Sequence, residues 1–168
     1  MMYCDGHNEF LLAGYNSDVV RNVVACYERW KSQPSELVEN LKYETTETAC
    51  ESIFTYVLEN VRYKIDPDGV QYIKSPARLL RDKEGDCKSF SIFIAACLHC
   101  LNIPHAFRFV NFDGSNQYSH VYVVAKDEQN RMIIIDPVDR INEDTIAGGE
   151  PCFNYARPFS RNKDIIVQ

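Results

Sequence analysis

The segment from Phe90 to Leu101 is the most apolar part of this 168-residue chain. If it forms a helix, apolar side chains occupy nearly every side of that helix, namely Phe90, Ile92, Phe93, Ile94, Ala95, Ala96, Cys97 and Leu98. A helix that is apolar all round has no face to turn toward water, so other elements must surround it. The segment is too short to span a bilayer. We therefore expect a buried central helix.

Cys87 lies where that helix begins. Gly85 and Asp86 suit the turn before the helix, which places the cysteine in the first helical turn. Unsatisfied N–H groups and the positive end of the helix dipole favour thiolate over thiol, and thiolate is the nucleophilic form. The alternative interpretation is a free cysteine that only packs at a helix end.

Two segments with a period of two follow downstream, as expected of strands. One begins at His120 and the other ends at Asp136, and a polar turn, Lys126 to Asn130, separates them. A hairpin symmetric about Glu128 pairs Ala125 with Arg131 and puts His120 directly opposite Asp136. Their Cβ atoms would then be about 4.5–5.5 Å apart, so the carboxylate could hold the imidazole.

These three residues match the roles that acyl transfer requires. A thiol is the nucleophile, a histidine is its base, and a carboxylate orients the histidine. We therefore predict Cys87, His120 and Asp136 as catalytic residues.

Three further helices are expected upstream and should pack on the central one. The first is capped at Ser17 or Asp18, and a short second helix starts at Pro34. The third begins at Thr45 or Thr46 and buries Ala49, Ile53, Phe54, Val57, Leu58 and Val61. Residues 1–16 carry no readable periodicity. Ser75 and Pro76 open a short helix toward Gly85. Asn102 is a left-handed stop that ends the central helix. A strand over His105–Phe112 follows.

The sequence predicts one α+β domain, with a helical N-terminal half on an antiparallel sheet. We divide it into a helical lead-in (1–44), a catalytic core (45–137) and a wrapping tail (138–168) that ends in an edge strand. No repeat or glycine-rich linker indicates a second domain.

Composition indicates which kinds of binding partner and which cellular compartment are expected. A net charge of −6 gives no basic surface for nucleic acid. The N-terminus lacks the pattern of a secretion signal, and no segment suits a membrane span. Seven cysteines, an odd number, favour reduced thiols over disulfides. We expect a cytoplasmic protein without membrane or nucleic-acid partners.

Metal sites are the main competing hypothesis. Cys97 and Cys100 form a C-x-x-C unit near His99 and His105, and Cys4 with His7 could complete a zinc site from afar. Two cysteines make only half a site, so core packing is the better interpretation. Residues 66–69 superficially resemble a calcium loop but lack its alternating ligands and late glutamate, which favours a turn. We predict no metal and no cofactor.

Several short motifs resemble the transglutaminase-like family of papain-like cysteine enzymes, including its small bacterial and phage-type members. They are Gly-Asp-Cys at 85–87, Leu-Asn-Ile-Pro at 101–104, His-Val-Tyr-Val at 120–123, Ile-Asp-Pro at 135–137 and Ser-Pro-Ala-Arg at 75–78. Three separated catalytic motifs in this order are fairly specific. The resemblance covers roughly residues 46–137 and implies that family's fold.

The resemblance also implies an activity on peptide or isopeptide amides. The backbone N–H of Cys87 would donate to the oxyanion, with Gln71 as the first candidate for a second donor and Tyr72 as the other. Hydrolysis is favoured over transfer to an amine. Partners would be a protein or peptide substrate and, by analogy with phage relatives, a virion assembly component. A catalytically silent binding module on the same fold is the alternative.

Overall fold

The computed structural model describes residues 9–12, 16–67, 70–110, 118–138, 152–155 and 162–167, with side chains for 18–67, 70–110 and 118–138. The helices are α1 (Asn16–Trp30), α2 (Ser35–Val38), α3 (Thr46–Asn60), α4 (Pro76–Asp82) and α5 (Cys87–Cys100). The strands are β1 (Glu9–Leu12), β2 (Arg62–Tyr63), β3 (Val70–Ile73), β4 (Glu84–Gly85), β5 (His105–Val110), β6 (His120–Lys126), β7 (Met132–Asp136), β8 (Cys152–Tyr155) and β9 (Asn162–Val167).

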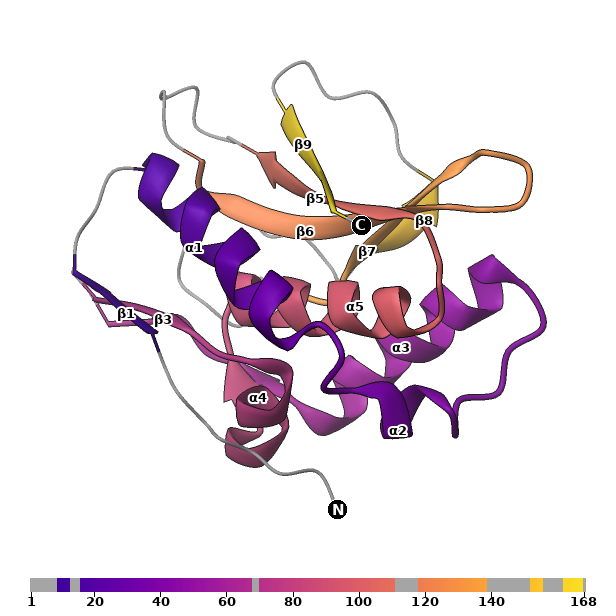
Figure 1. The fold of residues 1–168 in the computed structure, drawn as a ribbon, viewed down its shortest axis with the longest axis horizontal. Coiled ribbons are helices and arrows are strands. Elements are labelled where there is room, and N and C mark those ends of the chain that lie inside the picture. The colour runs from indigo at the N-terminus through magenta and orange to yellow at the C-terminus, as the bar shows by residue number, and fades with distance from the viewer. Residues whose placement is uncertain are drawn as a thin grey trace.

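A five-stranded antiparallel sheet carries the helices on one of its faces (Figure 1). Its strand order is β8-β7-β6-β5-β9. Two small sheets lie beside it, an antiparallel pair of β1 with β3 and a parallel pair of β2 with β4. The predicted α+β class is confirmed.

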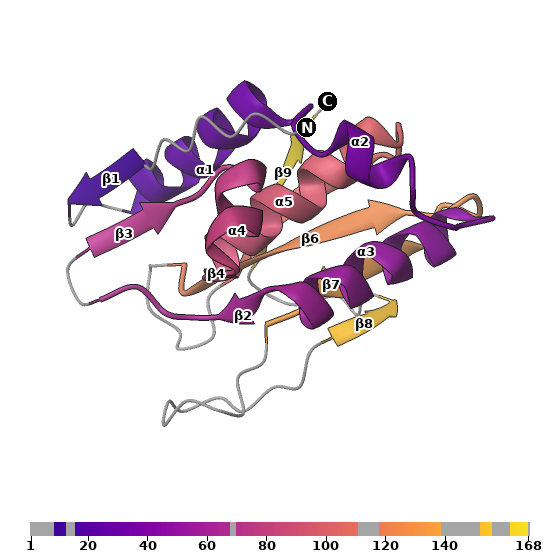
Figure 2. The same cartoon turned by 90° about the horizontal axis from the view of Figure 1, so that it is seen from below.

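Helix α5 is the centre of the fold. Every residue from Lys88 to Leu98 is buried, as the apolar segment predicts. The helix lies between α1 and α3 in both ribbon views (Figures 1 and 2) and contacts all four other helices as well as β5 and β6. Because it is enclosed on all sides, its first turn is held firmly in place.

Side-chain caps fix where the helices begin. The Thr45 hydroxyl accepts from the Thr48 backbone N–H in a capping box, and the Ser75 hydroxyl accepts from Arg78 N at 3.3 Å. Asn102, just beyond α5, adopts a φ of 57°. Each of these boundaries follows from residue types that favour caps and left-handed stops.

The hairpin of β6 and β7 has a different register from the predicted one. Val123 pairs with Ile135 and Ala125 with Ile133, so the turn centres on Gln129 and not on Glu128. The Asp127 carboxylate accepts from Gln129 N at 3.0 Å and from Arg131 N at 2.7 Å, and Asn130 has a φ of 63°. These local bonds shift the pairing by two residues, so His120 and Asp136 are not directly opposed.

Other expectations fail where tertiary pairing decides the structure. Strand β1 forms in the segment without readable periodicity, because β3 supplies its hydrogen-bonding partner. Leu58 of α3 is 43% exposed and not buried. The tail contributes strands at both sheet edges, β8 beside β7 and β9 beside β5, whereas only a last strand is expected from the sequence. Strand β5 ends at Val110, and residues 111–112 lie outside the described part.

Across the described residues, no helix combines the length and the apolar character that crossing a bilayer requires.

Candidate active site

Cys87 is the first residue of α5 and is half-buried. Asp86 is the N-cap, and its Oδ1 accepts from Lys88 N at 3.1 Å and from Ser89 N at 3.2 Å. A Cβ at Gly85, just before it, would lie 2.5 Å from Leu79 Cδ1 and 3.1 Å from Ser89 Cβ, so a larger residue there would force these side chains to move. The backbone at Gly85 thus packs closely against α4, and the thiol of Cys87 follows at the N-terminus of α5.

His120 and Asp136 meet although they are not opposed in the hairpin. Their Nε2 and Oδ2 atoms are 2.8 Å apart, and both side chains are largely buried. A shift of two residues keeps both side chains on the same face of the sheet, since the side-chain period of a strand is two. Diagonal neighbours remain within reach of long side chains.

The same histidine also interacts with the thiol of Cys87. Because Nε2 is hydrogen-bonded to Asp136, Nδ1 is the ring nitrogen that can accept the proton of the thiol. The structure therefore brings together all three residues that were predicted to be catalytic.

The pKa of His120 reflects this environment. Burial by itself would lower it, but the charge and hydrogen bond of Asp136, with a smaller contribution from Cys87, raise it to about 9. An imidazole with a raised pKa holds its proton at neutral pH. The pair is thereby suited to a thiolate beside an imidazolium.

Ser91 ties the cysteine helix to the histidine strand. Its hydroxyl lies one helical turn after Cys87 and donates to the carbonyl oxygen of Val121 at 3.0 Å. Val121 directly follows His120. This buried hydrogen bond fixes the distance between the two elements that carry the thiol and the imidazole.

The predicted oxyanion donors lie on β3. Gln71 and Tyr72 are both half-buried, and the Tyr72 backbone N–H donates to Asp66 Oδ2 at 2.6 Å. The end of this strand reaches α5, because Lys74 N donates to Ser89 Oγ at 3.2 Å. Their role at an oxyanion stays a prediction.

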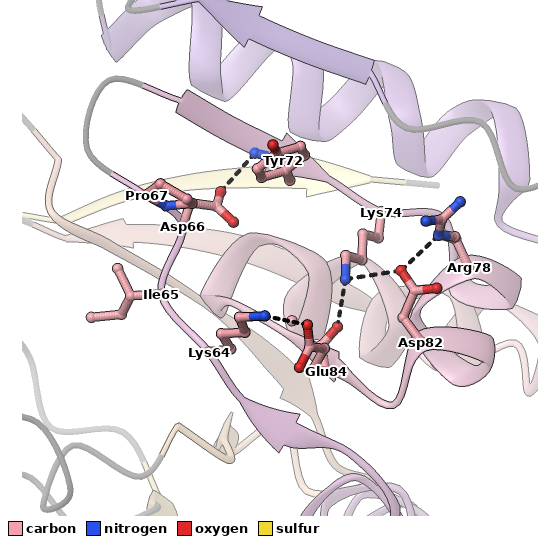
Figure 3. A pocket seen from close by; sticks show the side chains of 10 residues that line it. Lys64, Ile65, Asp66, Pro67, Tyr72, Lys74, Arg78, Asp82 and Glu84 are labelled. Atoms are coloured by element: carbon pink, nitrogen blue, oxygen red, sulfur yellow. Dashed lines mark hydrogen bonds and ion pairs between the residues drawn. The ribbon is translucent and has the colours of Figure 1, made fainter.

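A pocket of about 310 Å³ lies beside the segment that leads into α5 (Figure 3). Gly85, two residues before Cys87, forms part of its wall, and Tyr72 and Asp66 form another part. Lys74 crosses it, with its Nζ 3.0 Å from Asp82 Oδ2 and donating to the Glu84 carbonyl oxygen at 2.8 Å (Figure 3). The charged groups at the pocket are thus largely paired with one another.

Three residues of the hypothetical zinc site, Cys97, Cys100 and His105, lie in the core or form other hydrogen bonds. Cys97 is buried in the core, and Cys100 Sγ donates to the carbonyl oxygen of Lys31 at 3.4 Å. His105 Nδ1 donates to the Ile103 carbonyl at 2.7 Å, so its Nε2 accepts from the Tyr27 hydroxyl at 3.1 Å. Within the described ranges no three His, Cys, Asp or Glu side chains gather as metal ligands would. Cys4 and His7 lie outside those ranges.

Three residues beside the site did not emerge from sequence reasoning: Ser91, Lys88 and Asp66. Ser91 carries a usable signal, since it is a polar residue four positions after Cys87 in an otherwise apolar helix. Lys88 carries a similar signal at the start of that helix. Asp66 carries none, because its contact with Lys88 spans 22 positions.

Comparisons with known proteins agree with this fold. A model of the transglutaminase-like superfamily matches residues 33–137, so the chain belongs to that superfamily. No curated protein matches the sequence.

Two solved structures resemble this chain, and the first of them shares its fold. One is a candidate protease from Parabacteroides distasonis ATCC 8503, with a TM-score of 0.59 and 11% identity over 73% of this chain and 30% of that one. The other is a candidate cysteine protease from Cytophaga hutchinsonii, with a TM-score of 0.46 and 15% identity over 92% of this chain and 54% of that one. The chain thus spans about a third and about half of these two proteins.

Proposed function

We propose that this protein is a thiol-dependent acyl-transfer enzyme that hydrolyses peptide or isopeptide amides. The observation that carries the proposal is the continuous contact from Cys87 through His120 to Asp136 at the N-terminus of a buried helix. Membership of the transglutaminase-like superfamily and the protease name of the structural neighbour from Parabacteroides distasonis support the same chemistry.

In the first half of the reaction the Cys87 thiolate attacks the carbonyl carbon of the amide. The negative charge moves to the carbonyl oxygen, where the backbone N–H of Cys87 and a donor from β3 would stabilise it. His120 holds the proton of the thiol and gives it to the nitrogen of the leaving amine. The C–N bond breaks and a thioester remains on Cys87.

In the second half water attacks the thioester. His120 takes a proton from the water, and Cys87 leaves as a thiolate while the acid product departs. Asp136 balances the imidazolium charge in both halves. If an amine enters in place of water, the outcome is amine transfer, and this is the second activity that the same thioester allows.

The test is a peptide acyloxymethyl ketone carrying a fluorophore, a probe that modifies thiols of cysteine hydrolases. It should label the wild-type protein at Cys87, and the variants Cys87→Ala and His120→Ala should not be labelled. Cys97→Ala is the matched control, since it removes a thiol from the same helix and should label normally. No labelling of folded wild-type protein would favour a catalytically silent binding module.

Water and amine as acceptors are separated by a second measurement. The protein is incubated with a glutamine-containing protein substrate and a fluorescent primary amine. Fluorescence incorporated in a Cys87-dependent manner indicates transfer, whereas new peptide termini indicate hydrolysis. We expect hydrolysis.

A further inference from the structure

Lys88, the residue directly after the proposed nucleophile, is a buried cation. Its side chain is 7% exposed, and its Nζ is bonded to Asp86 Oδ2 and lies 3.3 Å from Asp66 Oδ2. Taking an ammonium group out of water costs several kcal/mol unless carboxylates compensate it. A buried lysine at this position therefore carries a desolvation penalty, and its two carboxylates must offset that free energy.

The two carboxylates belong to different parts of the site. Asp86 caps α5 through its other oxygen. Asp66 lines the pocket described above and accepts from the backbone N–H of Tyr72, on the strand of the predicted oxyanion donors. Lys88 thus joins the first turn of the nucleophile helix to the pocket wall and to β3.

The ammonium group also acts on the thiol electrostatically. The charged groups that face it are Asp86, Asp66 and Cys87. Burial alone would lower the pKa of Lys88, but Asp86, Cys87 and Asp66 together raise it, so the lysine remains charged. The interaction is mutual, and a fixed positive charge favours a neighbouring thiolate.

We propose that Lys88 is a positioning residue for the nucleophile: its buried ammonium group holds Asp66 and β3 against the start of α5 and supplies a fixed positive charge beside the Cys87 thiolate. The inference rests on the proposed function, because it gives a role to the residue next to the proposed nucleophile.

The experiment measures the rate of Cys87 alkylation by iodoacetamide as a function of pH. Lys88→Met removes the lysine cation but leaves the carboxylates of Asp86 and Asp66, while the His120 imidazolium stays, so the midpoint of the profile should move to higher pH by roughly one unit. Asp66→Asn keeps an oxygen for Tyr72 N–H but removes a negative charge, so its midpoint should move to lower pH. Thermal unfolding establishes that each variant is folded.

Lys64→Met is the matched control. Lys64 also forms an ion pair near the pocket, at 2.5 Å from Glu84 Oε1, but its side chain is 56% exposed, and the profile should not move. Midpoints that stay in place, or that move in the same direction in Lys88→Met and Asp66→Asn, would overturn the inference. A shift in Lys64→Met as large as that in Lys88→Met would do so as well.

If Lys88→Met does not fold, Asp66→Asn decides: a midpoint moved to lower pH supports the inference and an unchanged midpoint overturns it. If wild-type Cys87 reacts no faster than an ordinary thiol, the proposed function fails. The pH midpoints of Cys87 alkylation in the variants can still be measured at the slower rate. Their directions then test the role of Lys88 independently of the proposed function.

Discussion

His120 and Asp136 are joined across a diagonal of the β6–β7 hairpin, with Nε2 and Oδ2 2.8 Å apart. The register of the two strands is shifted by two residues from a hairpin symmetric about Glu128. The contact survives this shift because both residues keep their side of the sheet and the imidazole is long enough to reach a diagonal neighbour.

Replacing Asp136 with Asn should leave the fold intact and slow turnover. An amide can hold His120 in the wrong tautomer and cannot balance the charge of an imidazolium, so we expect a loss on the order of 10²–10⁴-fold. The measurement is the rate of labelling by the peptide ketone probe, together with a thermal unfolding curve. Wild-type labelling by a folded variant would remove Asp136 from the catalytic residues.

Gln71→Ala should slow reaction with the peptide ketone by about 10²–10³-fold, because addition to a carbonyl creates an oxyanion. Alkylation by iodoacetamide creates none and should proceed at the wild-type rate, so the ratio of the two rates isolates the oxyanion donor. Tyr72→Phe is the companion variant. If only Tyr72→Phe lowers the ratio, the hydroxyl of Tyr72 is the donor; if neither does, the backbone alone supplies it.

Ser91→Ala should reduce stability by about 0.5–1.5 kcal/mol, the net contribution of one hydrogen bond, and should also slow Cys87 alkylation. The second effect is expected because the bond to Val121 sets the position of His120 relative to the thiol. Ser52→Ala is the control, since it removes a similar bond that runs from α3 to the Lys42 carbonyl at the exposed surface. An alkylation rate in Ser91→Ala equal to that in Ser52→Ala would make Ser91 purely structural.

Much of this fold could be predicted because local chemistry determines it. The apolar character of α5, the caps at Thr45 and Ser75 and the stop at Asn102 all follow from residue types whose preferences act within one turn of helix. The family motifs, in turn, indicated the residues that meet at the candidate site, because their order along the chain was sufficient.

The remainder depends on partners distant in sequence. Strand β1 exists because β3 pairs with it, and the buried bond between Lys88 and Asp66 joins residues 22 positions apart. The hairpin register depends on which N–H groups the Asp127 carboxylate binds, and several turns with different centres suit that polar segment. Neither composition nor periodicity specifies these choices.

Stability should also fall at mildly acidic pH through His105. Burial, with the nearby charges of His99 and Lys31, lowers the pKa of His105 although its bond to Ile103 opposes this. A histidine with a pKa lowered by folding contributes stability that is present above the unfolded value of about 6.5. That stability is lost as the pH falls through the lower, folded value.

The corresponding measurement is the thermal midpoint of wild type and of His105→Gln from a pH of about 7.5 down to about 5, a range that spans the unfolded histidine pKa. The midpoint of the wild type should fall more steeply than that of the variant. Parallel curves would show that His105 does not couple folding to pH.

The reactivity of Cys87 should differ from that of the other described thiols. Burial raises the pKa of Cys50 to about 12, that of Cys97 well above its usual range, and that of Cys100 to a smaller extent. Cys26 is buried as well. The side chains of Cys4 and Cys152 lie outside the described part of the chain, so these two are the thiols against which Cys87 must be compared.

The most direct test is therefore peptide mapping after brief iodoacetamide treatment of native protein at a pH of about 6, where an ordinary thiol with a pKa of about 8.5 is almost wholly protonated. Cys87 should be alkylated first, and His120→Ala should abolish that advantage. If Cys4 or Cys152 reacts as fast as Cys87, exposure explains the reactivity and the catalytic assignment is contradicted. If Cys87 reacts first but His120→Ala does not slow it, the thiolate exists and the assignment of His120 as its base is contradicted.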